Sequence, residues 1–117
     1  MKDATVYLHH ILECIGRIEE DTREGRDAFF ASHTLQDAVL RNVQTLSESA
    51  QRLPASVKGA HPEVEWRDIA AFRNVLVHNY LGIDLEKIWD IVQRDIPRLK
   101  RSVILMLKSL EEASQNP

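Results

Sequence analysis

Apolar residues recur along this chain at intervals of three and four positions, and this spacing constrains the fold more than any other feature. Such runs occupy residues 2–22, 35–53, 66–80 and 85–110. The inward positions of the first run are Tyr7, Ile11, Cys14, Ile15 and Ile18. No convincing run alternates with the period of two that marks a β-strand. The sequence therefore predicts an all-α fold, a bundle of four or five helices that run up and down.

Residues that break or cap helices predict the ends of the first two long helices. Gly25 and Asp27 interrupt the first pattern, and residues 28–30 are expected to form a short turn whose two phenylalanines fill the core. Ser32 or Thr34 can cap the second long helix, because a hydroxyl oxygen accepts a hydrogen bond from a free backbone N–H of the first turn.

Proline and glycine divide the next part of the chain. Pro54 ends the second long helix, and residues 55–65 predict an irregular connection. The third helix is expected to begin near Trp66 and to continue through Tyr80, with Gly82 placed to stop it.

The fourth helix is the longest and contains a proline. Asp84 can cap its start, and its apolar pattern continues to residue 110. Pro97 lies inside that pattern, lacks a backbone N–H and would clash with the preceding turn. We therefore expect Pro97 to kink this helix or to split it in two.

Length and charge narrow the class of protein. With 117 residues, 44% of them apolar, the chain is expected to form a single domain over residues 1–117. The net charge of −3 argues against a protein that coats nucleic acid through bulk electrostatic attraction. Residues 94–101 carry four basic side chains and one acidic one. Such a strip could contact phosphates, but it is more often a solvated face.

Cysteine content and hydropathy indicate the compartment. The single cysteine, Cys14, excludes an internal disulfide and is expected to be a small buried hydrophobe. No segment approaches 18 uninterrupted apolar residues, and the start of the sequence lacks the apolar core of a signal peptide. We expect a soluble, cytoplasmic protein without a membrane-spanning segment.

The segment from Arg73 to Tyr80 carries the chemistry of the chain. Arg73, His78 and Tyr80 lie within eight residues of an otherwise apolar helix. A guanidinium can hold a phosphate through paired hydrogen bonds, and an imidazole can move a proton near neutral pH. These two groups are the minimum equipment for cleaving RNA without a metal. The tyrosine adds a hydroxyl that a partner enzyme could modify.

Helical spacing divides this motif into two pairs. Positions four apart are neighbours on a helix and positions seven apart align, so Asn74 pairs with His78 and Arg73 with Tyr80. The Asn74 amide can fix the tautomer of the His78 ring through a hydrogen bond. Arg73 is expected near the apolar side of the helix, where partial burial would strengthen its attraction for a phosphate.

A twofold dimer would bring two copies of the motif into one cleft. Ala70 and Ala71 are small enough to let two such helices approach closely. Residues 69–77 are apolar nearly all round, which suits a buried interface better than a surface helix. We therefore expect a homodimer with a composite site.

Other residues are weaker candidates. Asn42, beside Arg41 on the second long helix, could support the motif helix by a hydrogen bond, and a satisfied structural pair is at least as plausible a role. Lys58 and Arg67 could guide RNA toward the cleft, although solvated surface is the stronger expectation.

A metal site near the start of the chain is an alternative. His9 shares a helical face with Glu13, and His10 shares one with Cys14. Two side chains on one face do not complete a zinc shell, so packing of the helix is the expected role and no metal is assigned.

The motif resembles the signature of the HepT-like toxins of the HEPN superfamily (higher eukaryotes and prokaryotes nucleotide-binding domain). That signature is an arginine, four residues, a histidine, one residue and a tyrosine, and here it reads Arg73-x4-His78-x-Tyr80. The resemblance covers most of residues 3–105. The further segments that resemble the family are residues 36–42, 62–67, 82–85 with Trp89, and 95–99.

The resemblance implies a HEPN-like helical homodimer with facing motif helices and the activity of a metal-independent endoribonuclease. The substrate would be tRNA or mRNA, with no cofactor. The toxin's partner in such pairs is an antitoxin, a minimal nucleotidyltransferase called MntA, which transfers AMP from ATP to the motif tyrosine, here Tyr80. His78 would act as general base or acid, and Arg73 would stabilise the charge of the transition state.

A binding module is the competing interpretation. A HEPN-like dimer could hold a nucleotide or an RNA end without cutting it, and the acidic balance of the chain favours this modestly. Cleavage of labelled tRNA in EDTA would separate the two functions.

Overall fold

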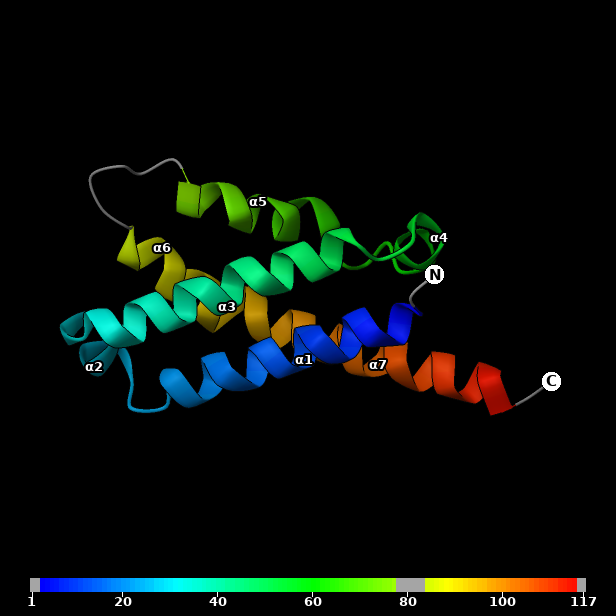
Figure 1. Cartoon of the computed structure of the whole chain (residues 1–117), viewed down its shortest axis with the longest axis horizontal. Helices are drawn as coiled ribbons and strands as arrows, with labels where there is room; N and C mark the ends of the chain where they lie inside the picture. Colours follow the sequence, from blue (N-terminus) through cyan, green and yellow to red (C-terminus); the bar gives the residue numbers. More distant parts are fainter. Residues whose placement is uncertain (1–2, 78–83, 116–117) are drawn as a thin grey trace.

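The computed structural model describes residues 3–77 and 84–115, and this part of the chain contains helices and no strand. The elements are α1 (Ala4–Asp21), α2 (Arg26–Ala31), α3 (His33–Gln51), α4 (Ala55–Ala60), α5 (Trp66–Val77), α6 (Leu85–Asp90), the π-helical turn η1 (Ile91–Asp95) and α7 (Ile96–Gln115). The last three follow one another without a break, and residues 85–115 are named here the C-terminal rod. In the described residues, α1, α3, α5 and this rod run alternately up and down (Figure 1), so the predicted all-α bundle is confirmed.

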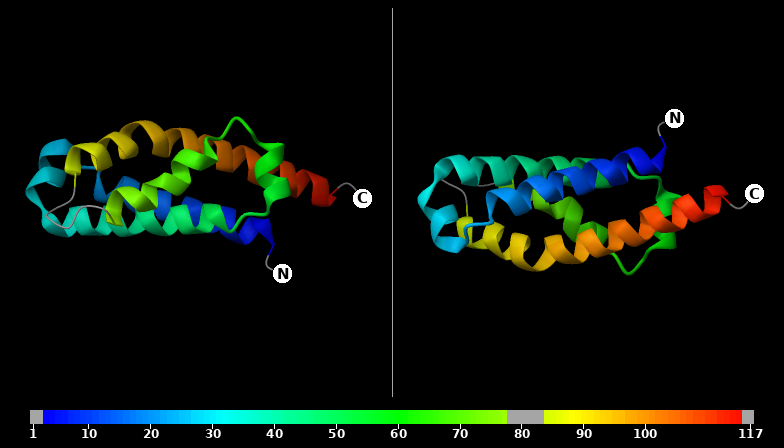
Figure 2. Two further views of the ribbon diagram at one scale, coloured as in Figure 1. Left: turned by 90° about the horizontal axis from the view of Figure 1, so that it is seen from above. Right: turned by 90° about the horizontal axis from the view of Figure 1, so that it is seen from below.

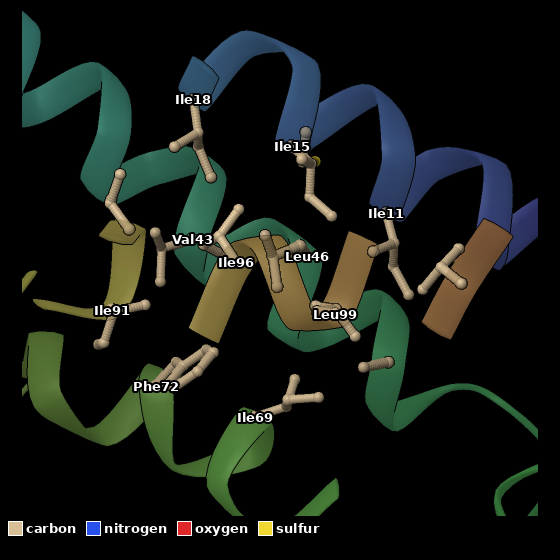
Figure 3. Close-up of a cluster of buried hydrophobic side chains, with 14 of the residues drawn as sticks. Ile11, Ile15, Ile18, Val43, Leu46, Ile69, Phe72, Ile91, Ile96 and Leu99 are labelled. Atoms are coloured by element: carbon tan, nitrogen blue, oxygen red, sulfur yellow. The ribbon is translucent and has the colours of Figure 1, made fainter. Parts of the chain in front are cut away.

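Branched apolar side chains form the core between α1, α3 and the rod. Ile11, Ile15 and Ile18 of α1 are fully buried, as are Val43 and Leu46 of α3. The predicted inward face of the first helix is confirmed at these three positions and at Cys14, while Tyr7 is half-buried. Figure 3 shows the side chains that meet them from the rod, Ile91, Ile96 and Leu99.

Two of the predicted caps are confirmed. Ser32, one of two candidates, accepts a hydrogen bond from the Leu35 backbone N–H at 3.2 Å and so caps α3. Asp84 accepts one from the Lys87 backbone N–H at 3.2 Å and caps α6. Each side chain satisfies a donor that the first turn of a helix leaves free.

The aromatic turn between the first two long helices is itself a short helix, α2. Phe29 is fully buried, and its ring centroid lies 5.4 Å from that of Trp89 in α6. The prediction that these aromatics fill the core is confirmed for Phe29, while Phe30 is half-buried.

The prediction of an irregular connection over residues 55–65 was wrong for its first half, which forms α4. The carbonyl oxygen of Pro54 accepts hydrogen bonds from the Val57 and Lys58 backbone N–H groups, at 3.0 and 3.1 Å. Proline is compatible with the start of a helix, because its missing N–H would have no partner there. Gly59 lies near the end of this helix, where glycine costs little stability.

The C-terminal rod accommodates Pro97 through the π-helical turn at residues 91–95. The backbone N–H of Ile96 bonds to the carbonyl oxygen of Ile91, five residues earlier. In a regular α-helix the proline ring would clash with the carbonyl of Gln93. The wider turn relieves that clash, so the predicted disturbance takes the form of a π turn within a helix that continues.

α1 packs against both α3 and α7, and α5 packs on α3. Figure 2 shows α5 running obliquely over the space between α3 and the C-terminal rod, with both ends of the chain at one end of the bundle. Gly82, the predicted stop of the motif helix, lies outside the described residues. In the described part of the chain, every helix is too short or too polar to span a lipid bilayer.

Candidate functional site

α5 carries the first part of the motif, and one aromatic residue fixes its start. The indole N–H of Trp66 donates to the carbonyl oxygens of Lys58 and His61, both at 3.1 Å. The helix therefore begins against the end of α4, and the predicted start at Trp66 is confirmed. Asp68 lies in the first turn, where the helix dipole favours negative charge.

Apolar burial and one hydrogen bond hold α5 on α3. Ile69 and Phe72 are each 5% exposed and extend toward the core (Figure 3). The hydroxyl of Ser47, fully buried on α3, donates to the Ile69 carbonyl oxygen at 2.8 Å. A buried hydroxyl needs a partner, so this bond fixes where α5 lies along α3. The sequence analysis did not identify this role of Ser47. A hydroxyl side chain next to the inward apolar positions of a helix could have indicated a buried hydrogen bond.

Arg73 is exposed in the single chain, so the expectation that its side chain is partly buried was wrong for the isolated protomer. It lies one residue beyond the buried Phe72, and a step of about 100° takes it to the edge of the apolar stripe. Asp68, five residues earlier, lies about 140° away around the helix, on the other edge. The exposed arginine can meet an anion from solution.

The remaining motif residues are not placed. His78 and Tyr80, together with the side chain of Asn74, lie outside the described part of the structure, and their pairings stay predictions. Asn42 is half-buried on α3, and its amide donates to the Ala38 carbonyl oxygen at 2.9 Å in the same helix. Its support of the motif helix also stays a prediction.

A groove separates α5 from the C-terminal rod. Two cavities of about 150 and 280 Å³ share Asp68 and Phe72 of α5 and Asp95 of the rod. Phe72 contributes to an apolar floor, and Lys87 and Arg98 are cations at the wall. The carboxylates that line this surface, named here the acidic groove, are Glu63, Glu65, Asp68, Asp90 and Asp95.

Carboxylates in the acidic groove crowd one another. A hydrogen bond with Asp68, followed by the charge of Asp68, raises the pKa of Glu65. Burial, followed by the charge of Asp68, raises the pKa of Asp95, and Arg98 opposes this shift. A raised carboxyl pKa means that the surroundings disfavour the ionised form. Among the described residues, the negative charge in the groove therefore exceeds the positive charge.

The alternative metal site at the start of α1 gains no support. His10 Nδ1 lies 2.6 Å from the Ser49 hydroxyl oxygen, and His10 Nε2 lies 3.9 Å from the Cys14 sulfur. Cys14 is 1% exposed, as expected for a small buried hydrophobe, and burial raises the pKa of its thiol. Over residues 3–77 and 84–115, no three His, Cys, Asp or Glu side chains are grouped to hold a metal ion.

The basic strip at residues 94–101 is partly neutralised within the chain. Lys100 Nζ donates to both carboxylate oxygens of Glu19, at 3.1 and 2.9 Å. Arg94 Nε lies 3.5 Å from a carboxylate oxygen of Asp90, in an exposed pair. These contacts favour the interpretation of the strip as a solvated face.

The sequence matches one protein family along most of its length. The family model described as ribonuclease HepT-like matches residues 11–106, which include the whole motif. The chain is 40% identical over 95 residues to the "Probable ribonuclease HepT" of Thermococcus cleftensis, covering 80% of this chain and 86% of that protein. It is 32% identical over 116 residues to a "Putative RNase" of Methanocaldococcus jannaschii, covering 98% and 96%.

A further relative is a longer protein. The "Gamma-glutamylcyclotransferase and putative RNase" of Methanocaldococcus jannaschii is 37% identical over 116 residues, which are 98% of this chain and 52% of that protein. The chain thus spans about half of that relative. No solved structure matches the chain.

Proposed function

The chain belongs to the ribonuclease HepT-like family, and from this membership we propose that it is a metal-independent endoribonuclease, the toxin of a toxin–antitoxin pair. The observation that carries the proposal is the intact Arg73-x4-His78-x-Tyr80 motif, whose arginine is exposed at the edge of the apolar face that holds its helix to the core. The names of the relatives support RNA as the substrate class.

The motif residues take distinct roles in this reaction. The His78 imidazole accepts the proton of a ribose 2′-hydroxyl, whose oxygen then attacks the adjacent phosphorus, and an imidazole protonates the leaving 5′-oxygen. The Arg73 guanidinium stabilises the negative charge that grows on the phosphate oxygens. The products are a 2′,3′-cyclic phosphate and a 5′-hydroxyl. Asn74 and Asn42 act as supports for the motif helix and the ring.

A homodimer supplies both imidazoles in this proposal. Ala70 is half-buried and Ala71 exposed on α5, so the helix presents small side chains beside Arg73. Two copies of α5 could approach closely there, with one His78 acting as base and the other as acid.

The partner of the toxin in this proposal is an MntA-like nucleotidyltransferase. The Tyr80 oxygen attacks the α-phosphorus of ATP, pyrophosphate leaves, and AMP stays attached to the tyrosine. The added bulk and negative charge beside Arg73 would block and repel the phosphate of the substrate. Incubation with this enzyme and ATP should add the mass of one AMP to the chain and nothing to Tyr80→Phe.

Cleavage of end-labelled tRNA or mRNA in EDTA tests the nuclease directly. The purified chain should cut the RNA and leave a cyclic phosphate, and Arg73→Ala and His78→Ala should each remove the activity. Binding of RNA without any cleavage would favour the second candidate, a non-catalytic RNA- or nucleotide-binding module. The net charge of −3 and the acidic groove are the observations on its side.

Mixed dimers test the composite site. Wild-type chain is mixed with increasing His78→Ala chain and left to exchange subunits, at constant total protein. If each site needs both imidazoles, activity falls with the square of the wild-type fraction. A linear fall would mean that each chain carries a complete site. The mixture with Tyr7→Phe, outside the motif, should stay fully active.

A further inference from the structure

The acidic groove is a surface that residues 3–77 and 84–115 leave open. α5 packs on α3, and on its other side the apolar contacts with the rod end at a floor that includes Ile69, Phe72 and Leu99. The two adjoining cavities lie above that floor, at about 150 and 280 Å³. Together they could receive side chains of another molecule, whose own apolar surface would be buried there.

The charges around this groove indicate what kind of molecule fits. Glu65, just before α5, and Asp68 of α5 lie on one side, and Asp95 of the rod lies on the other. The raised pKa values of Glu65 and Asp95 follow from their crowding and burial. Like charges gathered in this way cost stability unless positive charge meets them. Arg98 lowers both pKa values and Arg94 lowers that of Asp95. In the described part of the chain, the carboxylates that line the groove still outnumber these cations and Lys87.

The same charges exclude RNA from the groove. Phosphates would face carboxylates on both walls, and over such short distances physiological salt leaves part of this repulsion. Arg73 lies on the other edge of the α5 stripe from Asp68, so the motif can receive an anion without contact with the groove. The two edges of α5 thus suit ligands of opposite charge.

We propose that the acidic groove is the docking site for a segment of a partner protein that presents arginine or lysine side chains beside apolar ones. The cationic groups would pair with Glu65, Asp68 and Asp95, while the apolar groups would cover Phe72 and the floor. Such a partner would lie on the motif helix without occupying the face of Arg73. This inference rests on the proposed function for the existence of a protein partner.

Two triple variants of equal charge test the proposal. Glu65→Gln/Asp68→Asn/Asp95→Asn neutralises the groove, and Glu20→Gln/Glu24→Gln/Asp27→Asn neutralises three exposed carboxylates elsewhere. Both raise the net charge by the same amount, so bulk electrostatic attraction is matched. The probe is a synthetic peptide of Arg, Leu and Ala, titrated by calorimetry. The groove triple should weaken its binding about tenfold or more, and the control triple less than about twofold. Equal losses in the two triples would overturn the proposal.

Thermal unfolding gives a second readout. Because crowded carboxylates oppose folding, the groove triple should raise Tm above both the wild type and the control triple, while it weakens the peptide. If the groove triple raises Tm no more than the control triple does, the groove does not carry a destabilising excess of negative charge. Mg²⁺ and a 2′-O-methyl RNA are tested as ligands in the same way. If the wild type binds either of them and the groove triple does not, the groove is a site for a metal or for nucleic acid, and the proposal is overturned.

Failure of this proposal and failure of the nuclease are separable. The groove triple should still cleave labelled RNA in EDTA at the wild-type rate if the chain is a nuclease. A wild-type chain that binds the peptide through the groove but leaves RNA intact would refute the nuclease and keep the docking site.

Discussion

The interface between α1 and α3 and the space between α5 and the C-terminal rod are both bounded by helices but differ in what fills them. Between α1 and α3, apolar side chains such as Ile15 and Leu46 are fully buried and close the interface. Between α5 and the rod, apolar contact stops at Phe72, and carboxylates line the space above it. The α1–α3 interface stabilises the fold, and the groove between α5 and the rod leaves surface beside the motif for ligands. Substitutions on the two sides should therefore affect different properties.

The largest effect is expected from Arg73→Ala, on activity alone. Loss of the guanidinium should lower RNA cleavage by about 10²–10³-fold, because it removes stabilisation of transition-state charge. The exposed position means that the free energy of unfolding should change by less than about 0.5 kcal/mol. Gel assays in EDTA and urea titration measure the two quantities. Arg17→Ala, on the exposed side of α1, serves as the matched control and should keep full activity.

Ile15→Ala should lower the stability of the fold and does not touch the motif. Removal of this fully buried side chain should lower the free energy of unfolding by about 2–5 kcal/mol, through lost burial and the cavity left behind. Ile69→Ala should cost roughly half as much, because Ile69 borders the acidic groove and the gap can open to water. Urea titration of both variants measures the two losses in the free energy of unfolding. Equal losses would mean that the α5 side is packed as tightly as the α1–α3 side.

Ser47→Ala tests the hydrogen bond that joins α3 to α5. The variant loses the 2.8 Å bond to the Ile69 carbonyl, at an expected cost of about 1 kcal/mol. Because this bond positions α5, RNA cleavage should also fall more than the stability loss alone explains. Thr45→Ala, whose hydroxyl bonds within its own helix, should change neither quantity. A silent Ser47→Ala would show that apolar packing alone places α5.

The smallest effect concerns pH. The raised pKa values of Glu65 and Asp95 mean that the folded chain keeps protons there that the unfolded chain has lost. Their contribution to stability therefore falls as pH rises above their ordinary values of 4.5 and 3.8 and through the raised values. Asp68→Asn should flatten this fall in Tm between about pH 4 and pH 7, and Asp27→Asn should not. A wild-type Tm that stays level across this range would rule out the crowding.

The sequence determined most of the fold because its signals are local. Apolar spacing located all four long helices, and the polar caps Ser32 and Asp84 marked two of their starts. The error at residues 55–60 arose because Pro54, taken as a stop, also begins α4. Neighbouring sequence decides such points only in part, since a proline suits both the end of one helix and the start of the next.

The site was predicted less completely because part of it depends on distant residues. The motif stands in the sequence, but the exposure of Arg73 depends on how α5 packs on α3. Asp68 and Asp95 are far apart along the chain and meet only through the path of the rod. The apolar spacing within α5 or within the rod does not predict that the two form a groove together. Charge crowding of this kind arises from tertiary structure.

The π-helical turn gives the rod a spare residue. A deletion of one position within residues 91–95 could be absorbed by a return to ordinary α-helical hydrogen bonding, apart from the clash that Pro97 would then restore. Such a deletion would take out the extra residue that the wide turn holds, so the side chains of α7 would keep roughly their present direction relative to α6. Arg98 would still line the acidic groove. A deletion elsewhere in the rod would have no spare residue to remove and would turn every later side chain by about 100°.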